Sequence, residues 1–345
     1  MYKLWNRLLA LCLCAVMVPG VLTACGGETA KPETTPAATE STAEAKVLKV
    51  LTLGHSLAVD TGYMLNLICG TEGTGEYDEI VIGTLYYSGC RLSQHVDFMT
   101  KNAPEYRLYV SSSKTPDQPP ATIDEITMYN ALRFDYWDII VMMGNPWEID
   151  ADSGFTSGNI QKIQAYVNEN KLNPLAIYAW HMPWAMPADK ELLDMYPHDP
   201  NPHYQNYLAY NLDKSAHYEA QVGCVERHIL TDETFAFVIP TGTTIQNAWS
   251  SYLEEKDLHR DYGHASDLGR VMTSYTWYCM LMGVEQLEEI KLDAIPKQFL
   301  KSTEDKTQDR VLTDMEKAII LESVNNSLKN PMEMTQSQYT EAPAQ

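Results

Sequence analysis

The sequence predicts an α/β domain built around a mostly parallel sheet, because short apolar runs rich in β-branched residues alternate with segments of helical periodicity. Each apolar run is nearly continuous, which is typical of strands that are covered by helices on both faces. The chain shows no internal repeat and no sign of a second folded domain. About 285 residues remain after the polar ends are set aside, which is compatible with one α/β domain.

Six segments have the composition of buried strands, beginning with VLKVLTL and including DIIVMM. The expected strands are 47–53, 79–86, 107–111, 138–143, 174–179 and 235–239. The expected helices lie near 58–69, 93–102, 122–133, 157–171, 203–228, 243–253, 267–282 and 313–329. Ligands bind beyond the carboxyl ends of the strands in open parallel sheets, so the residues after each strand are the first candidates for a site.

The N-terminus has the pattern of a secretory signal peptide over residues 1–24, with Lys3 and Arg7 before the apolar run 8–18. This run is too short for a membrane-spanning helix, which needs about 20 apolar residues. The segment LTAC resembles the bacterial lipobox, which implies that Cys25 carries lipid and anchors the protein to the outer face of the cell membrane. Small and polar residues over 25–46 predict a flexible tether, and 332–345 has the composition of a disordered tail. The folded domain is therefore expected over 47–331.

The formal net charge of −21 argues against nucleic acid as a partner, because both surfaces would be negative. The cysteines of the expected domain are Cys69, Cys90, Cys224 and Cys279. None forms a C-x-x-C pair, so no zinc ribbon or thioredoxin-like motif is expected. They can either pair as disulfides outside the cytoplasm or lie buried as free thiols, and the sequence leaves both open.

Ser56 follows the first expected strand, after Gly54, at the point where the chain turns into a helix. A serine there can simply cap the helix. Asp261 and His264 supply what a nucleophile needs, because serine requires an adjacent base and the base requires a carboxylate that fixes its tautomer. A solvated turn containing Asp261 and His264 is the alternative. The three residues together predict a catalytic set.

Two further strand ends offer donors for an oxyanion, which the backbone N–H of Ser56 would also help to bind. Gly89 follows the second strand and can present its backbone N–H at close range because it has no side chain. Asn145 follows the fourth strand and can present its side-chain amide. Ordinary turn chemistry would explain either residue alone.

The order serine, glycine, asparagine and Asp-x-x-His resembles that of the SGNH (GDSL-like) hydrolases. The segments VLKVLTLGHSLAVD, LYYSGCRLSQHVDFMTKNAPEYRLY and IPTGTTIQNAWSSYLEEKDLHRDYGHASDLGRV resemble an uncharacterised, domain-of-unknown-function branch of that superfamily that is common in gut bacteria. The resemblance implies a flavodoxin-like three-layer α/β/α sandwich and a serine esterase with no metal and no cofactor. A short acyl group on a carbohydrate or another small ester is the implied substrate.

The sequence departs from the SGNH pattern at two places. The serine block reads Gly54-His55-Ser56, where the superfamily usually has aspartate or asparagine in the middle. The asparagine block reads Gly144-Asn145-Pro146, and the proline restricts Asn145 to extended conformations.

Four more side chains are candidates for substrate binding, namely Arg91, Trp147, Trp180 and Arg260. Arg260 can instead form a structural ion pair, and the tryptophans can instead lie in the core. His198 and His203 lie in the segment HDPNPH, for which a solvated loop is favoured over a metal site. Two alternatives to an enzyme stay open: a solute-binding lipoprotein of a transporter, and a degenerate SGNH domain that binds glycan without cleaving it.

Overall fold

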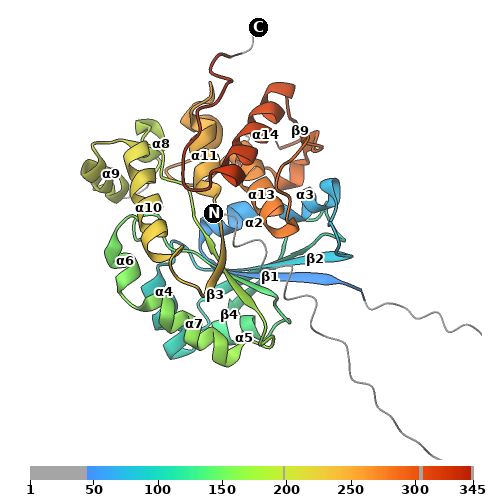
Figure 1. Ribbon diagram of the computed structural model, residues 1–345, viewed down its shortest axis with the longest axis vertical. Helices are drawn as coiled ribbons and strands as arrows, with labels where there is room; N and C mark the ends of the chain where they lie inside the picture. Colours follow the sequence, from blue (N-terminus) through green and yellow to red (C-terminus); the bar gives the residue numbers. More distant parts are fainter. Residues whose placement is uncertain (1–44, 197–198, 303–305, 343–345) are drawn as a thin grey trace, which may run out of the picture. The chain divides into compact units, whose positions relative to one another are not determined.

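The computed structural model describes residues 45–196, 199–302 and 306–342, and its centre is a seven-stranded sheet with the order β4-β3-β2-β1-β5-β6-β7 (Figure 1). The predicted signal peptide, Cys25 and nearly all of the predicted tether lie outside the described residues. The strands of this sheet are β1 (Val47–Gly54), β2 (Glu79–Tyr86), β3 (Tyr106–Ser112), β4 (Ala121–Ile126), β5 (Ile139–Met142), β6 (Ile177–His181) and β7 (Phe235–Ile239).

Five of the strands run parallel, in the spatial order β2-β1-β5-β6-β7. Numbered among themselves they follow the order 2-1-3-4-5 of flavodoxin-like sheets, so the predicted fold class is confirmed. The strand order reverses at β1, because β2 lies on one side of it and β5 on the other. The loops after β1 and β5 therefore leave the sheet at its switch point, where ligands bind in this class of fold.

The edge beyond β2 differs from the prediction. Strand β3 runs antiparallel to β2, and β4 runs antiparallel to β3, so the first part of the predicted helix 122–133 is a strand. Its side chains are mostly exposed, which hid the two-residue periodicity of a half-buried strand. The hydroxyl of Thr127 then accepts a hydrogen bond from the Asn130 N–H at 3.1 Å and starts the short helix α5.

Helices cover both faces of the sheet (Figure 1). One layer contains α2 (Ser56–Gly62), α3 (Leu65–Glu72), α11 (Thr241–Trp249), α13 (Asp267–Met282) and α14 (Asp314–Lys329). The opposite layer contains α4 (Leu92–Lys101), α5 (Met128–Leu132) and α7 (Asn159–Asn170). The remaining elements are α6 (Asp152–Thr156), α8 (Lys190–Asp194), α9 (Pro202–Tyr207), η1 (Leu208–Tyr210), α10 (Lys214–His228), α12 (Glu255–Leu258), β8 (Ala294–Ile295), η2 (Lys297–Phe299) and β9 (Arg310–Val311).

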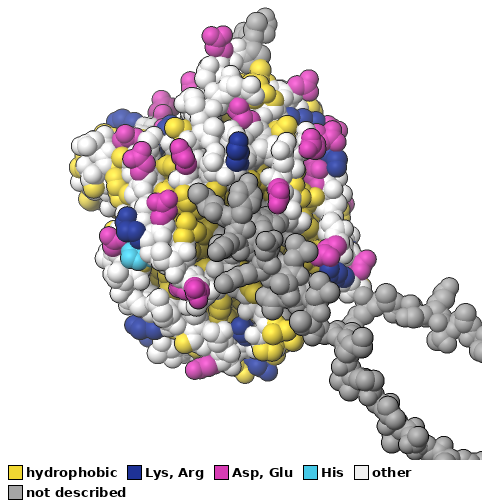
Figure 2. All heavy atoms as spheres, in the orientation of Figure 1, with side chains coloured by type: hydrophobic (Ala, Val, Ile, Leu, Met, Phe, Trp, Pro, Cys, Tyr) yellow, Lys and Arg dark blue, Asp and Glu magenta, His cyan; other side chains and the backbone are white. Residues whose placement is uncertain are grey.

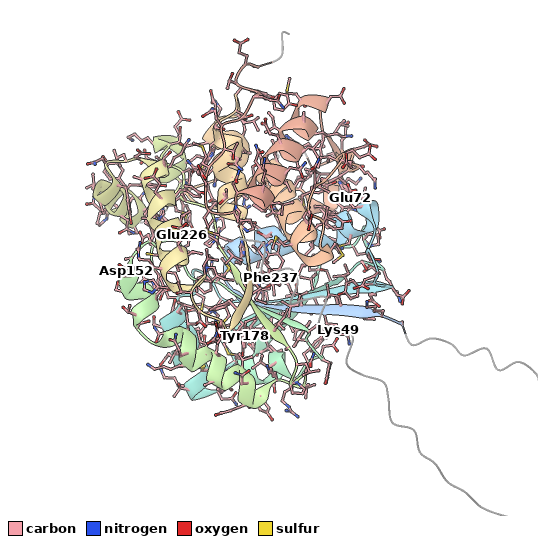
Figure 3. The ribbon with its side chains drawn as sticks, viewed as in Figure 1. Lys49, Glu72, Asp152, Tyr178, Glu226 and Phe237 are labelled. Atoms are coloured by element: carbon pink, nitrogen blue, oxygen red, sulfur yellow. The ribbon has the colours of Figure 1, made fainter. Side chains whose placement is uncertain are left out.

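Two carboxylates labelled in Figure 3 hold helices together. Glu72, at the end of α3, accepts a hydrogen bond from the Tyr275 hydroxyl of α13 at 2.7 Å. Asp152, in α6, accepts from Arg227 and His228 of α10 at 2.9 and 2.8 Å. These contacts join α3 to α13 and α6 to α10.

The packing of the domain shows the state of its four cysteines and the position of its C-terminal segment. The four cysteines of the domain are all buried and free, so the thiols are core residues. The prediction of a disordered tail is wrong for residues 332–342, because the Tyr339 carbonyl accepts from the Tyr252 N–H at 2.8 Å and Asn247 accepts from the Thr335 N–H at 2.7 Å. The polar composition of this segment gave no sign that it is bound to α11 and to the residues that follow α11.

The face shown in Figure 2 carries acidic side chains scattered among basic and hydrophobic ones, and the net charge of the chain is −21. Among the residues that the structure describes, no helix has the length and apolar character required to cross a bilayer.

Candidate active site

Ser56 is the first residue of α2, separated from the end of β1 by His55 alone, and the residue is partly exposed. Position one of a helix has no intrahelical acceptor for its backbone N–H. The hydroxyl and a free backbone donor therefore lie together at the switch point of the sheet.

His55, the residue that replaces the usual aspartate or asparagine, joins the serine loop to the loop after β5. Its Nδ1 accepts a hydrogen bond from the Leu57 N–H at 3.4 Å and so caps α2. Since Nδ1 accepts, the proton is on Nε2, which donates to the Gly144 carbonyl at 3.3 Å. Burial lowers the pKa of His55 to about 4, so the ring is neutral near pH 7. His55 thus ties the start of α2 to the loop after β5.

Close packing requires a glycine at position 54. A Cβ at this position would lie 2.7 Å from the Met143 sulfur and 2.9 Å from the Ala58 Cβ. Its backbone does not adopt a positive φ. The glycine lets β1 and β5 approach closely beside the serine.

Asp261 and His264 form the predicted pair. The His264 Nδ1 lies 2.9 Å from both carboxylate oxygens of Asp261, which also accepts from the backbone N–H groups of His264 and Gly263. A carboxylate only accepts, so Nδ1 carries the proton and Nε2 is free to act as a base. Burial alone would raise the pKa of Asp261, but the hydrogen bonds from His264 and Gly263 lower it to about 2.

Asp60 fastens the loop that carries this pair to the helix that carries Ser56. Its carboxylate accepts from the Arg260 guanidinium at 3.0 and 3.1 Å and from the Ala265 N–H at 3.0 Å. Asp60 is four residues after Ser56, so both lie on the same side of α2. The loop 260–265 is therefore docked one helical turn from the serine.

A second contact holds the same loop from the other direction, because the Trp184 indole donates to the Gly263 carbonyl at 2.9 Å. His264 lies near enough to His55 that its charge contributes to the lowered pKa of His55. Among the hydrogen bonds of the described residues, none joins the Ser56 hydroxyl to His264. The structure thus places serine, imidazole and carboxylate in one region, in which the serine and imidazole are not bonded.

Gly89 and Asn145, the two predicted oxyanion residues, lie side by side. The Asn145 side-chain amide donates to the Gly89 carbonyl at 3.4 Å, and its oxygen accepts from the Trp147 N–H at 3.1 Å. An amide nitrogen has two hydrogens, so one remains for another acceptor. Gly89 is exposed and has a φ of 59°, a left-handed backbone conformation that favours glycine.

The two tryptophans have different places. Trp180 is wholly buried in the core, where its ring packs between Phe155 and Phe235 at 5.7 Å from each, so its prediction as a substrate contact is wrong. Trp147 is partly buried, stacks on His217 with ring centroids 4.1 Å apart, and follows Asn145 directly. Its ring therefore lies beside the loop that contains Asn145.

The two arginines also differ. Arg260 forms the ion pair with Asp60, so the structural alternative holds for this residue. Arg91 is exposed at the start of α4. Burial raises the pKa of Glu148, and the nearby Arg91 charge opposes this rise. Arg91 is the one of the pair with an exposed cationic group.

Sequence reasoning missed Asp60 and His203. The sequence signal for Asp60 is a carboxylate four residues after Ser56, in a helix that otherwise has no charged residue. His203 was assigned to a solvated loop, but its Nδ1 accepts a hydrogen bond from the Trp147 indole at 2.6 Å. No local pattern pairs residues that are so far apart in the chain.

Three solved structures are similar to this protein, and the first of them supports the fold. A DUF4886 family protein from Bacteroides uniformis has a TM-score of 0.66 at 20% identity, with 86% of this chain and 100% of that chain covered. A protein from Slackia heliotrinireducens that is described, provisionally, as an SGNH hydrolase has a TM-score of 0.39 at 13% identity, covering 67% of this chain and 97% of that one. The salicylyl-acyltransferase SsfX3 from a tetracycline biosynthetic pathway has a TM-score of 0.34 at 15% identity, covering 71% and 56%.

No curated protein matches this sequence. The sequence profile of the domain of unknown function DUF4886 matches residues 49–298, which include Ser56, Gly89, Asn145, Asp261 and His264. The match covers well over half of the chain, so this protein belongs to the DUF4886 family.

Proposed function

We propose that this protein is an SGNH-type serine ester hydrolase in which Ser56 is the nucleophile, His264 the general base and acid, and Asp261 the group that orients His264. The observation that carries the proposal is the docking of the Asp261–His264 loop onto α2 through Asp60, one turn from Ser56. A structural or binding protein has no need for a buried ion pair that fixes an imidazole–carboxylate pair beside a partly exposed serine.

The chemistry follows from the free Nε2 of His264. This nitrogen takes the Ser56 proton as the hydroxyl oxygen attacks the ester carbonyl carbon, and the backbone N–H groups of Ser56 and Gly89 receive the oxyanion with the second amide hydrogen of Asn145. His264 then gives the proton to the alcohol as the carbon–oxygen bond breaks. Water attacks the acyl-enzyme with His264 as base, which releases the acid and restores Ser56. The mechanism requires the Ser56 hydroxyl and the His264 Nε2 to come within hydrogen-bond distance in the substrate complex.

The proposed setting is outside the cytoplasm. We infer from the signal peptide and the lipobox-like segment that Cys25 is the lipid-attachment site and that the domain acts at the outer face of the bacterial membrane. The substrates proposed for this location are small acyl esters of carbohydrates or of other alcohols. The acidic surface of the domain favours neutral substrates over anionic ones.

The test is hydrolysis of p-nitrophenyl acetate and of an acetylated monosaccharide by the protein that begins at residue 46. We expect Ser56→Ala and His264→Ala to lower kcat by about 10⁴-fold or more. Ser88→Ala is the matched control, because Ser88 is exposed in the neighbouring loop, and it should retain wild-type activity. A wild type that binds the acetylated sugar but hydrolyses neither ester would instead support a binding protein.

A further inference from the structure

The chain between β6 and α10 leaves the sheet and carries α8 and α9, which form the lobe at the upper left of Figure 1. His203, at the start of α9, bonds to the loop after β5. The Trp147 indole N–H donates to its Nδ1 at 2.6 Å. An indole N–H can only donate, so Nδ1 is unprotonated and the proton of the neutral ring is on Nε2.

The protonation state of His203 is fixed as well as its tautomer. Burial lowers the pKa of His203 to about 4, with a further contribution from His264, so the ring is neutral near pH 7. The Nε2–H has no hydrogen-bond partner in the described part of the chain, and this nitrogen is not buried. His203 therefore presents one neutral donor, in one orientation, to solvent.

Ring contacts connect this donor to the proposed general base. Tyr262 stacks on His203 with centroids 4.9 Å apart and an interplanar angle of 21°, and it contacts His264 edge-on at 5.5 Å. Tyr196 packs edge-on against both His203 and Tyr262, at 4.7 and 4.9 Å. Tyr262 thus links His203 to His264, and Tyr196 and Trp147 hold the His203 ring in place.

The position of His203 relative to His264 determines which part of an ester substrate His203 can contact. In the proposed reaction His264 protonates the leaving alcohol, so the alcohol must lie against His264 and its neighbours. The acyl oxygen must lie on the other side, against Gly89 and Asn145. A single neutral N–H next to aromatic rings suits a hydroxyl or ether oxygen. Arg260, the cation of the catalytic loop, is already bound to Asp60.

We propose that His203 is a specificity-determining residue whose Nε2–H binds an oxygen of the alcohol portion of the ester, and that this alcohol is neutral and carries several hydroxyl groups, as a sugar does. This inference rests on the proposed function at Ser56. It assigns substrate recognition to the α8–α9 lobe, which lies far in sequence from the catalytic residues.

The experiment compares an acetylated methyl glycoside with p-nitrophenyl acetate, whose alcohol has no hydroxyl group beyond the ester. We expect His203→Leu to lower kcat/KM for the glycoside about tenfold, chiefly through KM, because one neutral hydrogen bond is lost. The same variant should change kcat/KM for p-nitrophenyl acetate less than about twofold. His203→Gln should restore most of the loss, because its amide nitrogen can take the place of Nε2. Tyr204→Phe, an exposed neighbour on α9, should affect neither substrate.

Labelling with a fluorophosphonate separates failure of this inference from failure of the proposed function. If His203→Leu is labelled as fast as wild type and treats both esters as wild type does, or slows both equally, the inference is wrong and the assignment of Ser56 stands. If wild type is neither labelled nor active, both proposals are wrong.

Discussion

The Asp60 carboxylate on α2 binds the Arg260 guanidinium at 3.0 and 3.1 Å, across 200 residues of sequence. Asp60 is almost fully buried and also accepts from the Ala265 N–H, so the ion pair closes both ends of the loop that contains Asp261 and His264. The same contact that stabilises the loop also positions His264, the proposed base, relative to Ser56. Loss of this pair should reduce stability and catalysis together.

Replacement of Asp60 by asparagine tests that coupling. It leaves the Arg260 charge without its partner, so we expect a loss of about 3 kcal/mol in the free energy of unfolding. The displaced loop should lower kcat about 10- to 100-fold. Urea unfolding and ester hydrolysis measure the two effects. Asp97→Asn, which removes an exposed ion pair with Lys101, should change the unfolding free energy by less than about 1 kcal/mol. Full activity of Asp60→Asn would contradict the positioning role.

Asp261→Asn should impair the orientation of His264 without impairing the folding of the protein. The amide has nearly the same shape, but it cannot accept from Nδ1 with both atoms, so the His264 ring is no longer held in the tautomer that leaves Nε2 free. We expect kcat near pH 7 to fall by about 10³- to 10⁴-fold, with little change in thermal stability. Because the pKa of Asp261 is lowered to about 2, its protonation should not limit wild-type activity above about pH 4. A fall in kcat of less than about tenfold would remove Asp261 from the catalytic set.

Gly89 and Gly158 form a matched pair. Both have a positive φ, 59° and 72°, and a Cβ at either would meet no atom within 4 Å. Alanine at either position should therefore cost about 1 kcal/mol through backbone strain. Only Gly89→Ala should also reduce kcat, because the strained loop shifts the proposed oxyanion donor. Equal loss of kcat in both variants, or in neither, would argue against the assignment of Gly89.

Buried histidines predict an unusual sensitivity to mild acid. Burial lowers the pKa of His95, His181, His217 and His259 to about 3, whereas an unfolded histidine has a pKa of about 6.5. As the pH falls below 6.5, the unfolded chain binds protons that the native state does not, so stability is lost as the pH falls from about 6.5 towards 3. Each ring contributes up to about 1.4 kcal/mol per pH unit.

Urea unfolding at two pH values measures this effect. Between pH values of about 7.5 and 5.5, we expect the free energy of unfolding to decrease by about 3 to 6 kcal/mol. His259→Leu should reduce that decrease by about 1.4 kcal/mol. An unfolding free energy that is the same at both pH values would show that these histidines titrate normally.

Much of this architecture could be predicted from local sequence. The parallel strands and α13 are revealed by apolar runs and helical periodicity, and the candidates Ser56, Gly89 and Asn145 by their places after strands. The β3–β4 edge could not be predicted, because an exposed edge strand has no apolar face. The contacts of His55 with Gly144, of Trp147 with His203 and of Asp60 with Arg260 depend on tertiary packing, which pairs residues without any local spacing rule.

The most direct test of the central claim is intact-mass analysis after treatment with a fluorophosphonate, followed by peptide mapping. An activated serine should give one adduct per chain, on the peptide that contains Ser56, and Ser56→Ala and His264→Ala should abolish it while Ser88→Ala retains it. Wild-type protein that remains unmodified, or that is modified equally in Ser56→Ala, would contradict the proposal that Ser56 and His264 form a catalytic pair.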